Sequence, residues 1–190
     1  MKNNMFNPQP KPTKKQKEVI SANDFKKQYG TKKISTKSKK KSNNSQHYRF
    51  YSSNAWRWFR RYIISLYADP ETMTVPNFTG WKPLPMKGKE THVGHYIKVF
   101  EGSNSRMSIA FDERNVLPQS GQDNRYHGGK QDRMGEKIIL IHGEGTAHDL
   151  LQKSREVCIL RQSHFDDIAH IYKKKTEDIC AEKGLGKWWK

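Results

Sequence analysis

The distribution of charge along the 190-residue chain decides which part of it can fold. Residues 1–47 contain 13 lysines and only two acidic residues, so they carry +11 of the formal net charge of +17. This stretch also contains Pro8, Pro10 and Pro12 and few apolar residues, and it cannot bury enough surface to offset the entropy lost on ordering. We therefore expect a disordered basic arm over residues 1–47 and a folded domain over residues 48–190.

The excess of basic residues indicates a polyanionic partner. The chain has 36 Lys and Arg residues against 19 Asp and Glu residues and an isoelectric point near 9.9, which is typical of proteins that bind nucleic acid. No apolar run approaches the ~18–20 residues that cross a bilayer, so we expect a soluble intracellular protein with no membrane partner. In the arm, Lys39, Lys40 and Lys41 are expected to contact phosphates without reading sequence; the alternative is a solvated tail or a localisation signal.

The two cysteines do not predict a cross-link or a zinc site. Cys158 and Cys180 are far apart and form no Cys-x-x-Cys pair. Spacing therefore supports neither a disulfide framework nor cysteine-bound zinc, and we expect two buried thiols.

The folded part should begin with an amphipathic helix. Ser53 or Asn54 can cap a helix over residues 55–67, which Asp69-Pro70 would end. Its apolar residues at three- and four-residue spacing form the expected buried stripe: Phe59, Tyr62, Ile63 and Leu66. Arginines on its other faces are candidates for phosphate contact: Arg57, Arg60 and Arg61.

The pattern after this helix predicts an α+β fold. Thr146 and Ser163 are expected N-caps of the last two helices. The expected elements are a loop over residues 75–86, strands over 91–100 and 107–111 joined by a turn at 101–105, and helices over 132–141, 147–156 and 165–183. The core of this arrangement is a hairpin plus a helix at about 91–142, flanked by the first helix and by two C-terminal helices within 146–183.

Four tryptophans leave alternatives open. Trp56 and Trp58 can stack on bases, although packing in the core is the favoured interpretation. Trp188 and Trp189 near the C-terminus can grip a nucleic-acid strand or a partner protein, or fold back onto the domain.

A set of motifs between Val93 and Gly145 carries a family resemblance. The motifs are Gly94-His95-Tyr96, Phe111-Asp112-Glu113-Arg114-Asn115, Pro118-Gln119, Asn124, Gly129 and Gly143-Glu144-Gly145. In this register the segment resembles the HNH endonuclease domain of the phage lambda NinG (Rap) recombination nucleases. The resemblance implies a ββα-metal core and a phage endonuclease that hydrolyses phosphodiester bonds in branched DNA, such as D-loops and Holliday junctions. It also implies the cytoplasm of a bacterial host, recombination or replication proteins as partners, and leaves room for a homodimer.

The resemblance assigns roles to the polar residues of this segment. His95 would be the general base, because imidazole titrates near neutral pH. Asn115 would hold the loop that carries His95 through backbone hydrogen bonds, and Asn124 would bind the metal. His92 and His127 are further ligand candidates, for which a structural role is equally open.

Two basic residues of the segment have no assigned role. Arg114 and Lys130 are expected either to contact phosphate or to be solvated charges, and Asp112 and Glu113 to make structural ion pairs.

The expected cofactor is a divalent cation, Mg²⁺ or Mn²⁺, bound weakly until DNA phosphate completes its ligands. The family usually carries Cys-x-x-Cys pairs where this chain has Asn77-Phe78-Thr79-Gly80 and Ser120-Gly121-Gln122-Asp123, so we expect no structural zinc. Apolar residues are the expected replacement: Phe78, Trp81, Pro83, Leu84 and Pro85.

An alternative function is a non-catalytic nucleic-acid-binding protein that kept a degenerate HNH scaffold. Loss of activity should erode His95 and Asn124 together with the cysteines. Both residues are present, which favours the enzyme.

Overall fold

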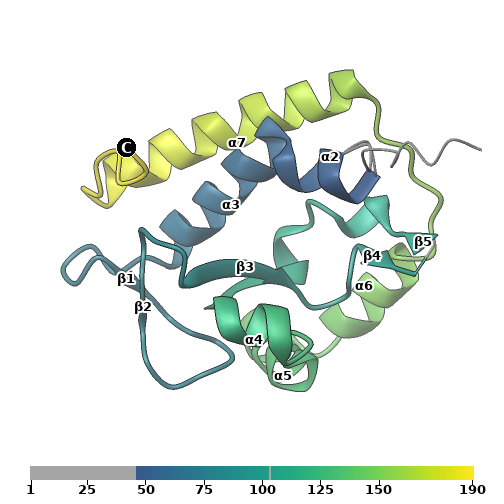
Figure 1. The fold of residues 1–190 in the computed structure, drawn as a ribbon, viewed down its shortest axis with the longest axis horizontal. Helices are drawn as coiled ribbons and strands as arrows, with labels where there is room; N and C mark the ends of the chain where they lie inside the picture. Colours follow the sequence, from purple (N-terminus) through teal and green to yellow (C-terminus); the bar gives the residue numbers. More distant parts are fainter. Residues whose placement is uncertain (1–45, 103) are drawn as a thin grey trace, which may run out of the picture. The chain divides into compact units, whose positions relative to one another are not determined.

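Helices α3 (Asn54–Tyr67) and α7 (Gln162–Glu182) pack along each other and carry much of the core (Figure 1). The computed structural model describes residues 46–102 and 104–190, all within one compact unit. Residues 46 and 47, which are predicted to belong to the disordered arm, instead begin a helix. The other expectations for the basic arm, including phosphate contact by Lys39, Lys40 and Lys41, lie outside the described residues.

Helix α3 begins at the predicted cap. The Ser53 hydroxyl accepts a hydrogen bond from the Trp56 backbone N–H at 3.1 Å, and the helix ends at Tyr67. Of the predicted stripe, Phe59 and Ile63 are fully buried, whereas Tyr62 and Leu66 are only half-buried. The short helix α2 (Gln46–Ser52) precedes α3 and contributes the buried Phe50.

Helix α7 and the C-terminal segment close over α3. The prediction of Ser163 as the N-cap of α7 is wrong, because the helix already includes Gln162 and is preceded by Arg161. At the far end, the Lys183 ammonium donates to the backbone carbonyls of Ser65, Leu66 and Ala68, where a helix C-terminus favours positive charge.

The terminal tryptophans fold back onto the domain. The indole N–H of Trp188 donates to the Ser65 hydroxyl at 2.9 Å, and the ring of Trp189 meets Trp58 edge to face at 5.6 Å. Of the alternatives left open by the sequence, packing against the domain is therefore the observed one.

The main strand pair differs from the predicted one. Strand β3 (Thr91–His95) pairs antiparallel with β6 (Val116–Ser120), in a register that places His92 opposite Gln119. The predicted strand over 107–111 is wrong, because Met107–Ile109 form the 3₁₀ helix η1. Ile109 and Ala110 are both fully buried, whereas a half-buried strand would alternate inward and outward positions.

The remaining elements are short strands and helices. The predicted loop over 75–86 contains a small antiparallel pair, and the turn after β3 contains another. The strands are β1 (Thr74–Val75), β2 (Leu84–Pro85), β4 (Phe100–Glu101) and β5 (Asn104–Ser105). After the 3₁₀ helix η2 (Glu113–Asn115) and β6 follow α4 (Gly121–Tyr126), α5 (Gln131–His142) and α6 (Thr146–Lys153).

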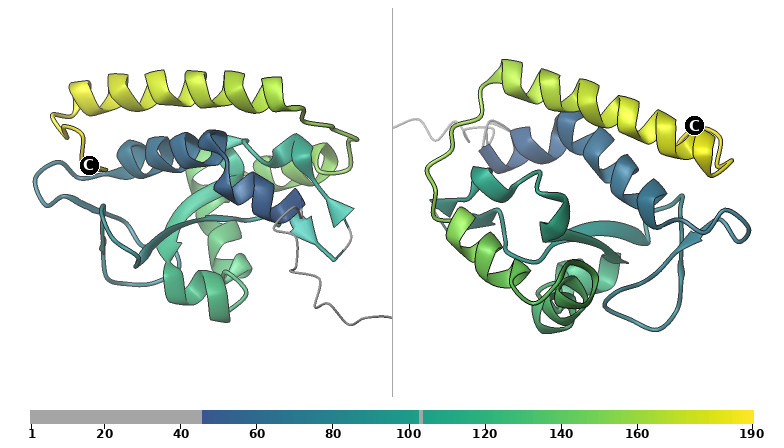
Figure 2. Two further views of the ribbon diagram at one scale, coloured as in Figure 1. Left: turned by 45° about the horizontal axis from the view of Figure 1, so that its top comes forward. Right: turned by 180° about the vertical axis from the view of Figure 1, so that it is seen from behind.

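The fold is α+β, and the strand pair is followed along the chain by helices (Figure 2). The predicted helix over 132–141 is confirmed with one additional residue at each end. The helix predicted over 147–156 ends three residues earlier, at Lys153. Thr146 lies inside this helix rather than at its cap, and its hydroxyl donates to the His142 carbonyl at 2.9 Å.

A polar network, rather than the expected apolar cluster, joins residues 77–80 to residues 120–123. The Thr79 hydroxyl donates to the Asp123 carboxylate at 2.9 Å, and Lys130 pairs with the same carboxylate at 2.7 Å. The Asn77 side-chain oxygen accepts from the Ser120 backbone N–H at 3.3 Å. The expected apolar replacement is wrong in large part. Trp81 is 93% exposed and Pro83 and Pro85 are exposed too, so only Phe78 and Leu84 pack inward.

Asp123 is the centre of this network, and we expect its removal to destabilise the domain. Burial alone would raise the pKa of Asp123, but hydrogen bonds from Lys130, Thr79 and His127 hold it well below its usual range. Asp123→Ala leaves these donors without their acceptor and should lower the free energy of unfolding by about 2–4 kcal/mol in urea melts. The exposed neighbour Gln122 provides the control, since Gln122→Ala should change it by less than about 0.5 kcal/mol. Equal stabilities of the two variants would contradict this account.

Candidate active site

A groove of about 800 Å³ lies beside β3 and contains His95. Its described lining residues come from α2, α3, β3, β4, α4 and the loops around them, and none of them is acidic. Four are cationic: Arg60, Lys89, Lys98 and Arg125. The groove therefore offers a positive, acid-free surface of the kind that binds phosphate.

The His95 imidazole is held in one tautomer. Its Nε2 lies 3.0 Å from the backbone carbonyl oxygen of Ala110. A carbonyl only accepts, so Nε2 carries the proton and Nδ1 keeps its lone pair. Trp56 stacks on the ring, with 5.1 Å between ring centroids and 23° between planes. Among the described residues Nδ1 makes no hydrogen bond, so it is available to accept a proton.

Burial lowers the pKa of His95 to about 4, against a weaker opposing effect of the Ala110 carbonyl. The unfolded chain has an ordinary histidine pKa near 6.5. As the pH falls from 6.5 to 4, the unfolded state binds a proton that the folded state does not, so stability falls over this window.

Lowering the pH from 7 to 5 protonates His95 in the unfolded chain but not in the folded protein. This difference should lower the free energy of unfolding by roughly 2 kcal/mol. Burial also lowers the pKa values of His92 and His142, so the test is a comparison of the parent with His95→Gln in urea melts at both pH values. The free energy of unfolding of His95→Gln should fall less on acidification than that of the parent. An identical fall in both proteins would contradict the lowered pKa of His95.

Asn115 ties the loop after His95 to the strand pair. Its side chain is fully buried. Its Oδ1 accepts from the Ile97 backbone N–H at 2.8 Å, and its Nδ2 donates to the carbonyls of Ile97 at 3.1 Å and Ile109 at 3.3 Å. Its backbone carbonyl also accepts from the Tyr96 N–H. These bonds fix the backbone on the C-terminal side of His95.

Asn124, His92 and Gln119 form a hydrogen-bonded chain at the other side of the groove. The buried Gln119 donates from Nε2 to Asn124 Oδ1 at 3.1 Å, and Asn124 donates from Nδ2 to His92 Nδ1 at 3.0 Å. Glycine at position 94 leaves room for Gln119, because a Cβ there would lie 1.4 Å from Gln119 Nε2 and would displace that side chain. Burial, followed by the charges of Arg125 and Arg60, lowers the pKa of His92, which keeps this imidazole neutral.

The other predicted ligand lies elsewhere. His127 Nδ1 contacts the Asp123 carboxylate at 3.0 Å, and His127 does not line the groove. Lys130 is bound to the same carboxylate. The structure thus brings together His95, His92 and Asn124, and places His127 and Lys130 in the polar network.

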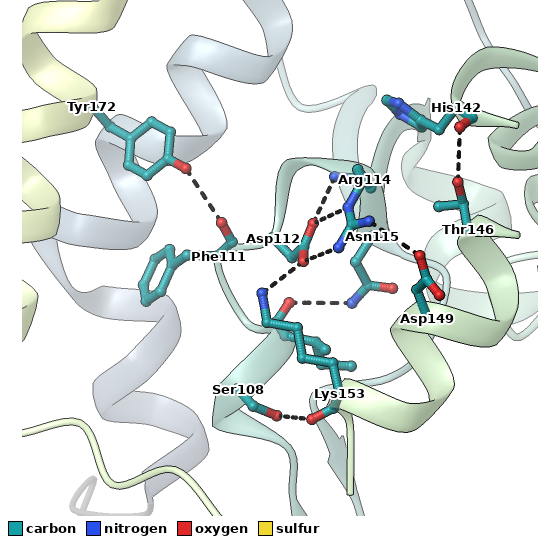
Figure 3. A network of polar contacts seen from close by, with 11 residues as sticks. Ser108, Phe111, Asp112, Arg114, Asn115, His142, Thr146, Asp149, Lys153 and Tyr172 are labelled. Carbon is teal, nitrogen blue, oxygen red and sulfur yellow. Dashed lines mark hydrogen bonds and ion pairs between the residues drawn. The ribbon is translucent and has the colours of Figure 1, made fainter. Parts of the chain in front are cut away.

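Of the predicted phosphate-binding arginines, one lines the groove and the others lie outside it. Arg60 lines the groove and donates to the Thr91 carbonyl at 2.6 Å. Arg57 is exposed outside the groove, and Arg61 lies over the rings of Trp58 and Trp189. Arg114 makes two hydrogen bonds to the Asp112 carboxylate, each of 3.1 Å (Figure 3).

Asp112 and Glu113 form the expected ion pairs. Lys153 joins Arg114 on the Asp112 carboxylate at 2.9 Å, and Lys175 pairs with Glu113 at 2.6 Å. Burial alone would raise the pKa of Asp112, but the hydrogen bonds from Arg114 and Lys153 lower it to about 2. Arg114 is thus part of an internal ion pair rather than a free phosphate contact.

Sequence reasoning missed several residues of the groove. Lys89, Lys98, Arg125 and Tyr51 line it, yet they belong to loops and helices with no shared sequence pattern. Arg125 was the one with a usable signal, because it directly follows Asn124.

The donor set suits a hydrated oxygen-seeking cation only in part. Asn124 Oδ1 has a second lone pair beside the one used by Gln119, and His92 is neutral. Within residues 46–102 and 104–190, no group of three or more His, Cys, Asp or Glu side chains is placed to hold a metal ion. A cation here would take its remaining ligands from water and DNA phosphate, as Mg²⁺ commonly does.

Comparisons with protein-family models, with curated proteins and with solved structures found no match to this chain. Among the helices of the described part, none is long and apolar enough to cross a membrane. The resemblance to the NinG nucleases therefore stays a prediction.

Proposed function

We propose that the protein is a metal-dependent DNA endonuclease whose active site is the groove around His95. The observation that carries the proposal is the state of this imidazole. Its proton is held on Nε2 by a backbone carbonyl, its Nδ1 is free, and it lies in a positive groove lined without acidic residues. The imidazole is neutral and can take the proton of the attacking water, but burial lowers its pKa to about 4 and makes it a weaker base than the near-neutral imidazole predicted from the sequence.

Different residues of the groove bind the phosphates, accept the proton and position the general base during hydrolysis. Arg60, Lys98 and Arg125 bind the phosphates on either side of the bond that is cut. His95 Nδ1 accepts the proton of the attacking water, and the Ala110 carbonyl keeps the imidazole oriented as its charge develops. Asn115 holds the loop that places this ring.

Asn124 and His92 are the residues that would hold Mg²⁺ or Mn²⁺. When bound, the cation supplies positive charge to the phosphate and to the departing oxygen. The hydrogen bond from Gln119 holds the Asn124 amide in one orientation and uses one lone pair of Oδ1.

The order of the elements supports the HNH interpretation. An antiparallel pair that carries His95 on its first strand is followed by helix α4, which carries Asn124, and this is the ββα order that the resemblance implies. The preference for branched DNA, the phage setting in a bacterial cytoplasm and the recombination or replication partners rest on the resemblance alone.

A second candidate is a non-catalytic nucleic-acid-binding protein. The observation that favours it is that Asn124 and His92 are bonded to each other, so a cation must displace this bond before His92 can bind it. Both candidates predict DNA binding, and only cutting separates them.

The experiment is a cutting assay on a labelled four-way DNA junction and a linear duplex of the same sequence. The nuclease should cut in Mg²⁺ or Mn²⁺, stop in EDTA and prefer the junction. Tight binding without cutting in either metal would favour the second candidate.

A further inference from the structure

We infer that the groove contains a subsite for an unpaired DNA base, which stacks on Tyr51 next to His95. The inference rests on the proposed function, since it names the form of DNA that the groove accepts. It starts from an aromatic wall that hydrolysis itself does not use.

Besides His95, four aromatic side chains line the groove: His47, Tyr51, Trp56 and Phe100. The His47 ring lies against Tyr51 and Phe100, with centroids 4.7 Å and 5.1 Å apart. Tyr51 meets Trp56 edge to face with ring centroids 5.2 Å apart, and its centroid lies 6.0 Å from that of Phe100. Trp56 is 8% exposed and Tyr51 is 38% exposed. Tyr51 therefore keeps part of its ring open to a ligand, whereas Trp56 is almost fully covered.

These aromatic side chains are in contact, through Trp56, with His95, the proposed general base. Trp56 contacts Tyr51 on one side and stacks on His95 on the other. A phosphate placed at His95 would have its own or its neighbouring nucleoside within reach of Tyr51. Lys98, which lines the groove three residues after His95, provides a cation for the next phosphate.

The surface fits a nucleobase better than it fits a purely apolar ligand. The groove combines a π-face with cationic side chains, as do proteins that bind single-stranded nucleic acid. Burial raises the pKa of Tyr51 to about 12, so its phenol stays uncharged beside phosphate.

The base must be unpaired for a geometric reason. A paired base has both faces covered by its neighbours in the stack, so an aromatic side chain reaches a face only when the base leaves the helix. The groove volume of about 800 Å³ is in the range of small-ligand sites, so the groove has room for a nucleotide. A bulge or a single-stranded gap provides such a base, whereas an intact duplex does not.

The test measures binding in EDTA, where no hydrolysis takes place, with the full-length protein. The probe is a duplex with a single bulged 2-aminopurine, compared with the same duplex fully paired. The parent should bind the bulged duplex more tightly and quench its fluorescence. Tyr51→Leu should weaken this binding about tenfold and lose the quenching, whereas Tyr51→Phe, which keeps the ring, should retain both.

The fully paired duplex is the control for a general loss of DNA binding, because the parent, Tyr51→Leu and Tyr51→Phe should bind it with equal affinity. Equal affinity of the parent for the two duplexes, or unchanged binding of the bulged duplex by Tyr51→Leu, would overturn the inference. This experiment measures binding and not cutting. A protein without nuclease activity could therefore still show the stacking, and a protein without the stacking could still cut DNA.

Discussion

Replacing His95 by alanine should slow DNA cutting by roughly 10²- to 10⁴-fold, the usual contribution of a positioned general base. Its Nδ1 is the free proton acceptor of the groove, because the Ala110 carbonyl occupies Nε2. DNA affinity should stay within about threefold, because affinity comes mainly from cationic contacts to phosphate. The measurement is a single-turnover time course on junction DNA together with a binding titration in EDTA.

His148 provides the matched control, since it is exposed on α6 and outside the groove. His148→Ala should cut at the parental rate. A His95→Ala protein that melts normally and cuts as fast as the parent would remove His95 from the mechanism.

Replacing Asn115 by alanine should lower the free energy of unfolding by about 3–5 kcal/mol. The side chain is fully buried and bonds three backbone groups, two on Ile97 and one on Ile109. Alanine would leave these groups without partners and away from water, and a buried unsatisfied polar group costs about 1–3 kcal/mol. Urea melts of parent and variant measure the difference.

The control is Asn104→Ala, because Asn104 is exposed on β5 and should change stability by less than about 0.5 kcal/mol. A loss at Asn115 no larger than at Asn104 would show that the loop after His95 is held by other contacts.

The helices of the fold were largely predictable because their signals are local. The Ser53 cap and the apolar spacing of Phe59 and Ile63 define α3, and apolar residues near Met134 and Ile138 define α5. Strand β6 was missed because Pro118 argues against a strand. In a two-stranded sheet each strand has an open edge, so a proline is tolerated there. The terminal tryptophans could not be placed, since their partners Ser65 and Trp58 are over 100 residues away in sequence.

The centre of the site was predictable from residue types and the rest was not. His95, His92 and Asn124 come together in the groove. His127, Lys130 and Arg114 were indistinguishable in sequence from free basic residues, yet Asp123 and Asp112 hold them. Which cation meets which carboxylate depends on loop packing, and a single sequence carries no pattern for that.

The central claim is that Asn124 and His92 would hold the divalent cation that supplies positive charge to the phosphate, while His95 takes the proton of the attacking water. The most direct test replaces a non-bridging oxygen of the cut phosphate by sulfur and compares cutting rates in Mg²⁺ and Mn²⁺. Sulfur is a poor ligand for Mg²⁺ and a better one for the softer Mn²⁺, so we predict slow cutting in Mg²⁺ that Mn²⁺ restores, with no such contrast for the oxygen substrate. Equal loss of rate in both metals, for each of the two sulfur isomers, would contradict the claim.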